Sequence, residues 1–365
     1  MATLLESAKT ARLQELAQAG AVGVIRPKGP RAGWLDRFSI HRGLCGVAPS
    51  DSDVSAGRCY AASAGVQLAK GETAWCCELV TQRDGVIIDP AAGRITTKES
   101  DVLIHSLEDR LGSDTRRWEI GRGSHHVLVA HEAGLPPDGA APIRPPELLV
   151  GQEWKRQLPR GAVGDALAVV IEQGAAVLEE HPVNRVRADL GENPANLLWL
   201  WGAGAEVPAR PFTDRTGMAG AVISSDFLMR GLAKTLGMAW KESPASLEER
   251  AIKQILKHLL GLLDAHDVVY VHLRVEHHDP VERLCAMERI DQLLLTALSE
   301  ALPSQGPWRL VMAVDDRTAA VIPWIAIGTG LPQHPVARLT AQDIAGSPLA
   351  FEDSAALFTW LTQPA

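Results

Sequence analysis

The sequence predicts an α/β fold in which a mostly parallel β-sheet is covered by helices. Beyond Gly204, short β-branched runs alternate with longer stretches whose apolar residues recur at helical spacing. Alternation of this kind favours parallel strands joined by helical crossovers. The length of 365 residues suggests roughly two domains, and the hydrophobic fraction of 46% is sufficient for buried cores.

The first half of the chain is expected to be a less regular mixture of helices, strands and turns. Apolar periodicity predicts helices at 4–19, 99–111 and 165–180 and strands at 21–25 and 125–129. Residues 85–89 and 93–95 resemble a hairpin or meander. The remaining stretches are expected to be loop at 43–57, short strand-like pieces at 57–81 and a proline-rich connection at 135–146.

In the second half of the chain, predicted strands alternate regularly with predicted helices. Strands are predicted at 220–224, 268–273, 309–314 and 324–327, and helices at 226–236, 246–263 and 281–302. Ser246 and Glu249 have the spacing of a capping box, which would open the second of these helices.

Residues 181–204 form the most distinctive stretch of the chain. A loop carrying Arg185 and Arg187 leads into Leu197-Leu-Trp-Leu-Trp201, which ends at Gly202-Ala-Gly204. This run is too apolar for a surface and too short for a membrane span. We therefore predict a buried strand that follows a loop with two closely spaced cations.

Composition excludes several classes of protein. The net charge of −8 argues against a general nucleic-acid surface. No apolar run approaches the ~20 residues that cross a bilayer, and residues 1–10 lack the apolar segment of a signal peptide. We expect a cytoplasmic protein with no membrane and no nucleic-acid partner.

The cysteines are not arranged as a disulfide framework or a zinc knuckle. Their number is odd, and no C-x-x-C pair occurs among Cys45, Cys59, Cys76, Cys77 and Cys285. Reduced thiols are expected. The adjacent Cys76 and Cys77 have the composition of a redox or soft-metal site, but a buried strand is the favoured interpretation.

Two histidine pairs are candidate metal ligands. His277, His278 and Asp279 lie in one acidic loop segment, and His125 is followed by His126. Imidazole and carboxylate groups suit zinc or manganese. The competing interpretation is that adjacent histidines point apart and are solvated. No H-E-x-x-H, nucleophile-elbow, P-loop or dinucleotide fingerprint occurs.

An ordered series of motifs resembles the archaeal-type cofactor-independent phosphoglycerate mutases of the alkaline phosphatase superfamily. The matching segments are Gly57-Arg58, Asp89-Pro-Ala-Ala-Gly-Arg-Ile95, His181-Pro-Val-Asn-Arg185 with Arg187, Ala195-Asn-Leu-Leu-Trp-Leu-Trp-Gly-Ala-Gly204, Gly220-Ala-Val-Ile-Ser224, and Met229-Arg-Gly231 to Gly237-Met238. The helix predicted at 4–19 and the segment 319–328 resemble further family elements, so the resemblance covers most of the chain.

The resemblance implies an alkaline-phosphatase-like core with an inserted α+β cap domain. Residues 1–56 and 181–365 would form the core, without the family's first strand, and 57–180 the cap. Active members of the family interconvert 2- and 3-phosphoglycerate. A core Ser or Thr takes the phosphoryl group, two divalent metals clamp the oxygens, and cap arginines hold the glycerate.

The nucleophile and first metal ligand of the family do not match this chain. The family's first strand ends in Asp-Gly, whereas here Met1 leads directly into the predicted helix. Between Pro27 and Cys45, Trp34 or Arg37 would stand at the nucleophile position. Ser39 is close, but its surroundings do not match.

The remaining metal-binding motifs are also altered. The loop after Val271-His272 is shorter than the family's P-D-x-x-G-H loop and reads Leu-Arg-Val-Glu-His-His-Asp279. The family's Asp-His-x-Thr-Pro motif appears as Asp315-Asp-Arg-Thr-Ala319, which keeps Asp315 and Thr318 only. The next segment, which supplies another histidine in the family, is missing. Without ligands of the right type, two divalent ions would have nothing to hold them.

The predicted cap departs from the family as well. Cys76 and Glu78 stand where the family's R-C-N strand has Arg and Asn, and Ala62-Ser63 replaces a Glu-Ala pair. A carboxylate at this position would repel an anionic substrate.

We therefore expect a degenerate phosphoglycerate mutase-like protein that acts as a non-catalytic binding or scaffold protein. No cofactor is expected. The partner would be a phosphorylated small metabolite or a protein. If an anion binds, the candidate residues are Arg58, Arg94, Asn184, Arg185 and Arg187. Surface charge or structural ion pairs are the competing interpretation of these residues.

Two alternatives remain open. The chain would be a 2,3-bisphosphoglycerate-independent phosphoglycerate mutase, or a related phosphoryl-transfer enzyme, if a site rebuilt around His277, His278 and Asp315 binds Mn, Zn or Mg. It would be a scaffold if it joins an active relative in a hetero-oligomer.

Overall fold

The computed structural model describes residues 4–26, 37–131, 135, 143–275, 279–315 and 321–363. The chain divides into two compact units. Unit 1 comprises Met1–Asp51, Phe212–Asp226 and Met238–Ala365, and unit 2 comprises Ser52–Pro211 and Phe227–Gly237. Unit 2 therefore takes in more of the chain than the cap predicted at 57–180.

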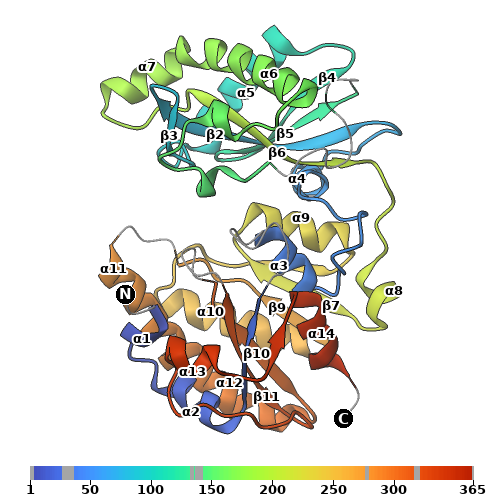
Figure 1. Cartoon of the computed structure of the whole chain (residues 1–365), viewed down its shortest axis with the longest axis vertical. Coiled ribbons are helices and arrows are strands. Elements are labelled where there is room, and N and C mark those ends of the chain that lie inside the picture. Colours follow the sequence, from blue (N-terminus) through green and yellow to red (C-terminus); the bar gives the residue numbers. More distant parts are fainter. Residues whose placement is uncertain are drawn as a thin grey trace. The chain divides into compact units, whose positions relative to one another are not determined.

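Unit 1 combines strands with a large set of helices (Figure 1). Its helices and helical turns are α1 (Leu4–Ser7), α2 (Ala11–Ala19), α3 (Arg37–Leu44), α8 (Phe212–Thr216), α10 (Glu249–Leu263), α11 (Pro280–Arg289), the π-helical turn η3 (Ile290–Leu295), α12 (Thr296–Ala301), η4 (Leu302–Gln305), α13 (Ala341–Ala345) and α14 (Ser354–Thr362). Its strands are β1 (Ala21–Ile25), β7 (Gly220–Ser224), β8 (Ala239–Glu242), β9 (Val268–Val271), β10 (Arg309–Ala313), β11 (Ile322–Gly328) and β12 (Ala350–Phe351).

The strands of unit 1 form two sheets. One has the order β8-β7-β9 and is wholly parallel. The other has the order β10-β11-β1-β12, in which β11 is antiparallel to both β10 and β1. The predicted alternation of strands and helices is confirmed, but the expectation of one mostly parallel sheet holds for β8-β7-β9 and for β1-β12 only. The antiparallel pair β10-β11 needs no helical crossover, which is why the alternation ends there.

Unit 2 is organised around an antiparallel sheet. Its strands are β2 (Thr73–Arg83), β3 (Val86–Asp89), β4 (Arg116–Arg122), β5 (His125–Ala130) and β6 (Leu197–Ala205). Its helices and helical turns are α4 (Ala56–Ala64), α5 (Thr97–Leu111), η1 (Pro146–Leu148), η2 (Trp154–Gln157), α6 (Ala162–Glu179), α7 (Pro182–Asp189) and α9 (Phe227–Thr235). The strand order is β3-β2-β5-β4, and β6 pairs with β2.

The tryptophan-rich run is the buried strand that the sequence predicts. Residues 197–201 of β6 are all buried, because the strand lies against β2 and beneath α6. The predicted boundaries placed this strand in the core, whereas its ladder with β2 makes it part of unit 2.

Several local predictions were wrong. Residues 181–189 are not a loop, because His181 caps α7 by accepting a hydrogen bond from the Val183 N–H. Residues 57–81 contain helix α4 and the long strand β2 rather than short strand-like pieces. The segment 93–95 is turn, and β3 pairs with β2. Helix α10 begins at Glu249 without a side-chain cap, so the predicted capping box does not form.

The N-terminus of α2 is capped by a side chain that is distant in the sequence. The N-terminus of α2 has no local side-chain cap at Thr10. Instead, the buried Asp291 in η3 accepts hydrogen bonds from the backbone N–H groups of Arg12 and Leu13, at 3.0 and 2.7 Å. A carboxylate at this position satisfies N–H groups that would otherwise have no partner.

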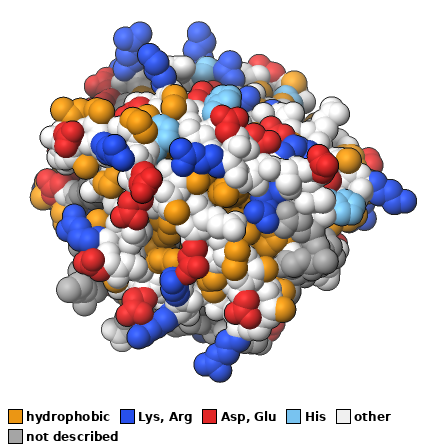
Figure 2. All heavy atoms as spheres, turned by 90° about the horizontal axis from the view of Figure 1, so that it is seen from above, with side chains coloured by type: hydrophobic (Ala, Val, Ile, Leu, Met, Phe, Trp, Pro, Cys, Tyr) orange, Lys and Arg blue, Asp and Glu red, His pale blue; other side chains and the backbone are white. Residues whose placement is uncertain are grey.

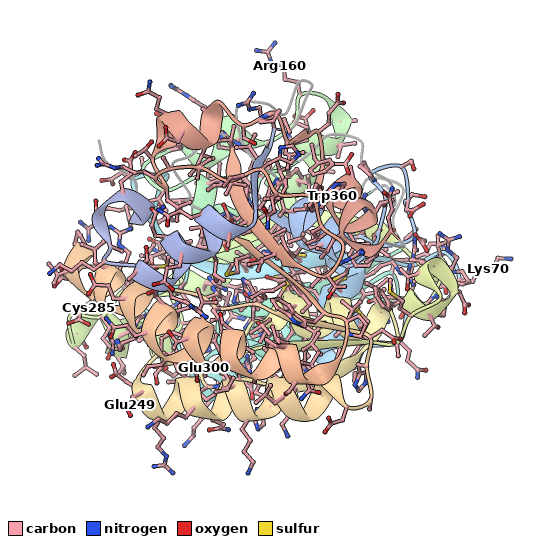
Figure 3. All side chains as sticks on the ribbon, turned by 90° about the horizontal axis from the view of Figure 1, so that it is seen from below. Lys70, Arg160, Glu249, Cys285, Glu300 and Trp360 are labelled. Carbon is pink, nitrogen blue, oxygen red and sulfur yellow. The ribbon has the colours of Figure 1, made fainter. Side chains whose placement is uncertain are left out.

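Helices α10, η3 and α12 form a layer of unit 1, and Figure 3 labels Glu249 and Glu300 on it. In the part of the chain that the structure describes, no helix is long and apolar enough to cross a membrane. Basic and acidic side chains are interspersed over the face shown in Figure 2.

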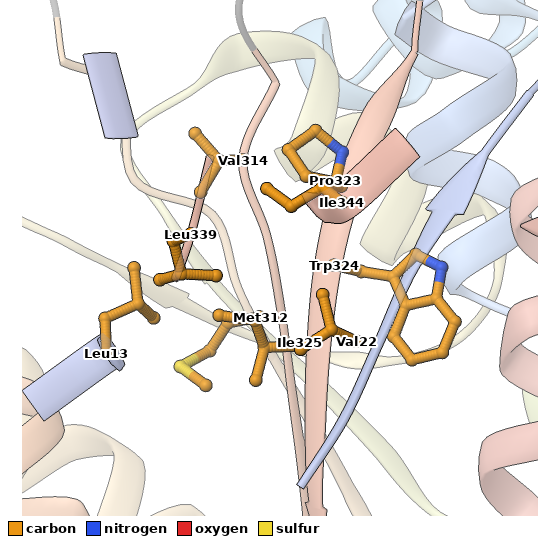
Figure 4. Close-up of a pocket in the computed structure, with 9 residues that line it drawn as sticks. All are labelled: Leu13, Val22, Met312, Val314, Pro323, Trp324, Ile325, Leu339 and Ile344. Atoms are coloured by element: carbon orange, nitrogen blue, oxygen red, sulfur yellow. The ribbon is translucent and has the colours of Figure 1, made fainter. Parts of the chain in front are cut away.

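A cavity of unit 1 is entirely apolar in its lining (Figure 4). Its volume is ≈ 10 Å³, about the smallest space that holds one water molecule. It is a packing defect rather than a binding site. The lining residues are Leu13, Val22, Met312, Val314, Pro323, Trp324, Ile325, Leu339 and Ile344.

Candidate functional site

The carboxyl ends of β7 and β9 bring buried polar groups together in unit 1. Ser224 ends β7 and His272 directly follows β9. Because these neighbouring strands are parallel, both residues lie at the same edge of the sheet. The Ser224 Oγ and His272 Nδ1 are 3.0 Å apart, and Ser224 Oγ also accepts a hydrogen bond from the Asp226 N–H. Ligands of open α/β sheets bind at this edge.

Helix α3 adds a second histidine to this cluster. The His41 ring lies edge-on to the His272 ring, with 4.7 Å between the ring centroids. His41 Nδ1 is 2.8 Å from the hydroxyl oxygen of Tyr270 in β9. Ser224, His272, His41 and Tyr270 therefore form a continuous array, in which Ser224 is buried and the three rings are partly buried.

Two arginine–carboxylate pairs flank the histidines. Arg274 forms an ion pair with Asp226, and Arg37 Nε lies 3.2 Å from Asp315 Oδ2. Each carboxylate side chain is about three-quarters or more buried. We call these two pairs, together with Ser224, His41, His272 and Tyr270, the polar cluster.

Burial governs the protonation of the polar cluster. Burial, followed by the neighbouring His272, lowers the pKa of His41 to about 3, against opposing contributions from Asp226 and Asp315. Burial likewise lowers the pKa of His272 and raises that of Tyr270. At neutral pH the two imidazoles and the phenol are therefore uncharged.

Arg187, a candidate anion ligand, is held inside unit 2. Only 3% of its side chain is exposed. Its guanidinium contacts Glu99 at 2.9 Å and Glu192 at 3.0 Å, and donates to the carbonyls of Asn193 and Ala92. These contacts use its hydrogen-bonding capacity to join α7 to the turn before α5.

Three other candidate anion ligands come from the same motifs, and one of them is buried while two are exposed. Asn184 is buried, donates to the carbonyls of Leu178 and Ala195, and accepts from the Ala195 N–H. Arg185 and Arg94 are exposed. Arg94 has a positive φ of 55° in the turn closed by Asp89.

Arg58 lies on α4, where its guanidinium donates to the Asp53 carbonyl. Burial lowers its pKa, against the opposing effect of nearby acidic groups. Its role as an anion ligand stays a prediction, as do those of Arg94 and Arg185.

Glu78 and Cys76 are both fully buried in β2. Tyr60 and Trp201 donate hydrogen bonds to Glu78 Oε1, at 2.7 and 2.9 Å. The second oxygen, Oε2, has no hydrogen-bond partner among the described residues. Glu78 is thus part of the core of unit 2.

The candidate metal ligands His125 and His126 lie in different surroundings. His126 is buried, with its ring nitrogens on the Gly121 N–H and the Gly123 carbonyl, whereas His125 Nδ1 lies 3.0 Å from the Tyr60 hydroxyl. Burial lowers the pKa of His126 to about 3. Neighbouring residues of a strand point to opposite faces, so this pair does not share a ligand.

The second proposed metal cluster is only partly described. Asp279 caps α11 by accepting from the Val281 N–H at 2.8 Å. His277 and His278 lie outside the described residues, as does Trp34. Within the described ranges, no three His, Cys, Asp or Glu side chains are grouped so that they could hold a metal ion.

Sequence reasoning missed most of the polar cluster. The sequence places Ser224 and His272 in predicted strands and in segments that resemble family motifs, and it singles out neither of them, nor His41 or Tyr270, as a site residue. The available signal was that polar residues directly follow two strands of a parallel sheet. The position of α3 beside that edge could not be read from spacing.

Comparison with known proteins supplies the family context. The family model described as 2,3-bisphosphoglycerate-independent phosphoglycerate mutase matches residues 43–184. A protein of this name from Methanosarcina barkeri is 30% identical over 87% of this chain and 80% of its own length. A second, from Methanothermobacter thermautotrophicus, is 30% identical over 93% of this chain and 84% of its own.

Solved structures show the same fold. A cofactor-independent phosphoglycerate mutase from Thermoplasma acidophilum matches 99% of this chain and 93% of its own, with a TM-score of 0.57 and 22% identity. A protein from Pyrococcus horikoshii matches 99% of this chain and 91% of its own, with a TM-score of 0.67 and 20% identity.

Proposed function

This chain belongs to the 2,3-bisphosphoglycerate-independent phosphoglycerate mutase family, and we propose that it is a member that has lost the two-metal centre and nucleophile. In this proposal it is a non-catalytic protein that binds a phosphorylated small metabolite or a protein partner. The alkaline-phosphatase-like core with an inserted cap is part of the same proposal.

The arginine pairing of Asp226 and Asp315 carries the proposal. Asp226 and Asp315 are the carboxylates of the polar cluster, and each already contacts a guanidinium. A divalent ion at either carboxylate would have to displace a cation that remains close by, which is electrostatically unfavourable. The adjacent His41 and His272 are taken up by Tyr270 and Ser224. These described residues do not fit a two-metal centre.

The same arginines define the ligand class that we propose. Guanidinium groups bind phosphate and carboxylate through paired hydrogen bonds. A phosphate monoester could take the place of an aspartate as the partner of Arg274 or Arg37. The relatives are named for phosphoglycerate, which carries both a phosphate and a carboxylate.

Enzyme assays test the loss of catalysis. The purified chain is incubated with Mn²⁺, Zn²⁺ or Mg²⁺, and mutase and phosphatase turnover are measured beside the Methanosarcina barkeri relative. We expect turnover at the level of the blank and metal well below one equivalent per chain. Turnover that EDTA removes would refute the proposal.

Calorimetry tests the ligand class. We expect 3-phosphoglycerate to bind the wild-type chain and to bind Arg274→Gln at least about tenfold more weakly, the cost of one charged hydrogen bond. Arg250→Gln, which removes an exposed arginine of α10, is the matched control and should bind as the wild type does. Equal binding by all three proteins would exclude Arg274 as the anion ligand.

The second candidate is an active phosphoryl-transfer enzyme. It is favoured by 30% identity to proteins named as mutases over most of their length. The site would be rebuilt around His277, His278 and Asp315, with Mn, Zn or Mg. Stoichiometric metal that is lost on the double substitution His277→Ala with His278→Ala, together with turnover, would favour this candidate.

A further inference from the structure

The C-terminal helix α14 lies against α3, the helix that supplies two members of the polar cluster (Figure 1). Arg37, the first residue of α3, pairs with Asp315. One turn later, His41 contacts Tyr270 and His272. Residues four positions apart lie on the same face of a helix, so one face of α3 is turned to the polar cluster. The position of that face depends on what holds the other sides of α3.

A buried hydroxyl of α14 is hydrogen-bonded to the backbone of α3. Ser354, the first residue of α14, is 2% exposed. Its Oγ donates to the Ile40 carbonyl at 2.8 Å, with a longer contact of 3.4 Å to the Ser39 carbonyl. Both carbonyls lie between Arg37 and His41 in the chain. A hydrogen bond at this point therefore constrains the backbone segment that carries both side chains.

The close approach of the two helices requires the glycine at position 43. A β-carbon added to Gly43 would collide with Ser354 Oγ and lie 2.8 Å from the Ala355 backbone nitrogen. Any larger residue would therefore push the helices apart. Glycine inside a helix is destabilising, because it has the most backbone freedom to lose. In α3 that cost accompanies a contact that no side chain permits.

Helix α14 is itself attached to the sheet β10-β11-β1-β12. Trp360 packs on Trp324 of β11, with 5.4 Å between the ring centroids. Arg309 Nη1 of β10 donates to the Leu361 carbonyl at 2.6 Å. The helix is thus tied to the sheet near its C-terminal end and to α3 at its N-terminal end, so it can serve as a fixed support.

Helix α3 is too short to keep its position by itself. It has 8 residues, and isolated helices shorter than about 12 residues are marginal in water. Its Ile40 belongs to a buried cluster that also contains Leu357 of α14 and Trp324. The position of α3 therefore comes from tertiary contacts, and α14 supplies both an apolar and a polar part of them.

We propose that α14 positions the anion site by holding α3 in place through Ser354 and Gly43. Without this contact, Arg37 and His41 would not be held at the polar cluster. Ser354 is a positioning residue, because its hydroxyl contacts the backbone of α3 and acts on the cluster through that helix. The inference rests on the proposed function for the anion that Arg37 would bind, whereas the position of His41 can be measured without a ligand.

Histidine NMR tests the positioning in the free full chain. Proton–nitrogen correlation spectra report the ring nitrogens of His41, which are assigned with His41→Gln. In Ser354→Ala we expect the Nδ1 signal to shift by more than its linewidth, because the 2.8 Å contact with Tyr270 changes. Thr359→Ala is the matched control. It removes an exposed hydroxyl of α14 that donates to the Ala355 carbonyl within the same helix, and it should leave the His41 signals as in the wild type.

Gly43→Ala perturbs the same contact from the other side. The added methyl group must separate the helices, so the His41 signals should move further than in Ser354→Ala. Adding Ser354→Gly removes the atoms nearest to that methyl group and should bring the signals back toward those of Ser354→Ala. A double variant displaced as far as Gly43→Ala alone would show that the two residues do not act through one contact.

Calorimetry with 3-phosphoglycerate connects α3 to the anion site. We expect Ser354→Ala to bind at least about threefold more weakly than the wild type. In an Arg37→Gln background the same substitution should have little further effect, because residues that act through one another are not additive. In an Arg274→Gln background it should keep its full effect, since Arg274 is not on α3.

Failure of this inference is distinguishable from failure of the proposed function. A wild-type chain that binds no 3-phosphoglycerate overturns the proposed function, while the His41 signals still decide whether α14 positions α3. Unchanged His41 signals in a Ser354→Ala chain that unfolds cooperatively overturn the positioning role. Binding that Ser354→Ala weakens equally in every background would indicate a general loss of structure and would overturn the link from Ser354 to Arg37.

Discussion

Ionisable side chains make different kinds of contact in the two units. In unit 2, Arg187 contacts two carboxylates and several carbonyls. It connects α7 to α5 and to the turn that precedes α5. In unit 1, partly buried ionisable groups face one another at the carboxyl edge of a parallel sheet. A buried charge surrounded by carbonyls is a structural element, whereas side chains that meet at a strand edge form a candidate site.

This contrast revises the weight given to the family motifs. The run from His181 to Arg187 carries the resemblance most clearly, yet Asn184 and Arg187 are engaged in holding unit 2 together. The motif in that run therefore reflects how unit 2 is built. The candidate site lies in unit 1, where Arg37 and Arg274 pair with the aspartates.

The largest expected effect comes from removing the buried guanidinium. Arg187→Ala leaves Glu99 and two backbone carbonyls without their partner and should lower the free energy of unfolding by about 3–5 kcal/mol. Arg185→Ala, two residues away and exposed, should change it by less than about 0.5 kcal/mol. Urea unfolding measures both, and similar values for the two variants would contradict a structural role for Arg187.

Acid should destabilise both units through their buried histidines. The pKa values of His41 and His126 are about 3 in the folded chain, below the ordinary value of 6.5. The unfolded chain therefore binds more protons between pH 6.5 and 3, so stability is complete above pH 6.5 and falls below it. Each histidine contributes about 1.4 kcal/mol per pH unit.

Hydrogen exchange at pH 7 and pH 5 locates this loss. We expect opening free energies to fall both in β5, which holds His126, and in α3, which holds His41. If only one unit became less stable, the histidine of the other would not be buried as a neutral group.

A smaller effect is expected where one carboxylate caps a helix. Asp291→Ala leaves the Arg12 and Leu13 N–H groups without an acceptor and should cost about 2 kcal/mol, at the upper end for a helix cap. Asp291→Asn keeps one acceptor and should cost less. Thermal unfolding compares the two, and equal losses would show that volume rather than capping matters.

The smallest effect is expected at Glu78. Glu78→Gln keeps an acceptor for Tyr60 and Trp201, so stability should change by less than about 1 kcal/mol. Glu78→Leu removes the acceptor from both donors and should cost about 2–4 kcal/mol. Urea unfolding distinguishes them, and a large loss in the glutamine variant would indicate that the charge itself stabilises unit 2.

Local sequence patterns determined much of the fold. Apolar periodicity located α5, α6, α10 and most strands of unit 1. A helix with one buried face, or a buried strand, shows a recognisable apolar pattern within a single short segment. It did not locate α4 or α7, because their stretches are rich in small or polar residues. The motifs also placed the chain in its family, since they are short runs that remain recognisable in one sequence.

Tertiary structure decided which of these residues could form a site. The polar cluster joins residues near positions 40, 225, 272 and 315, and no periodicity relates segments so far apart. Whether an arginine is a ligand or a structural ion pair depends on what surrounds its guanidinium after folding.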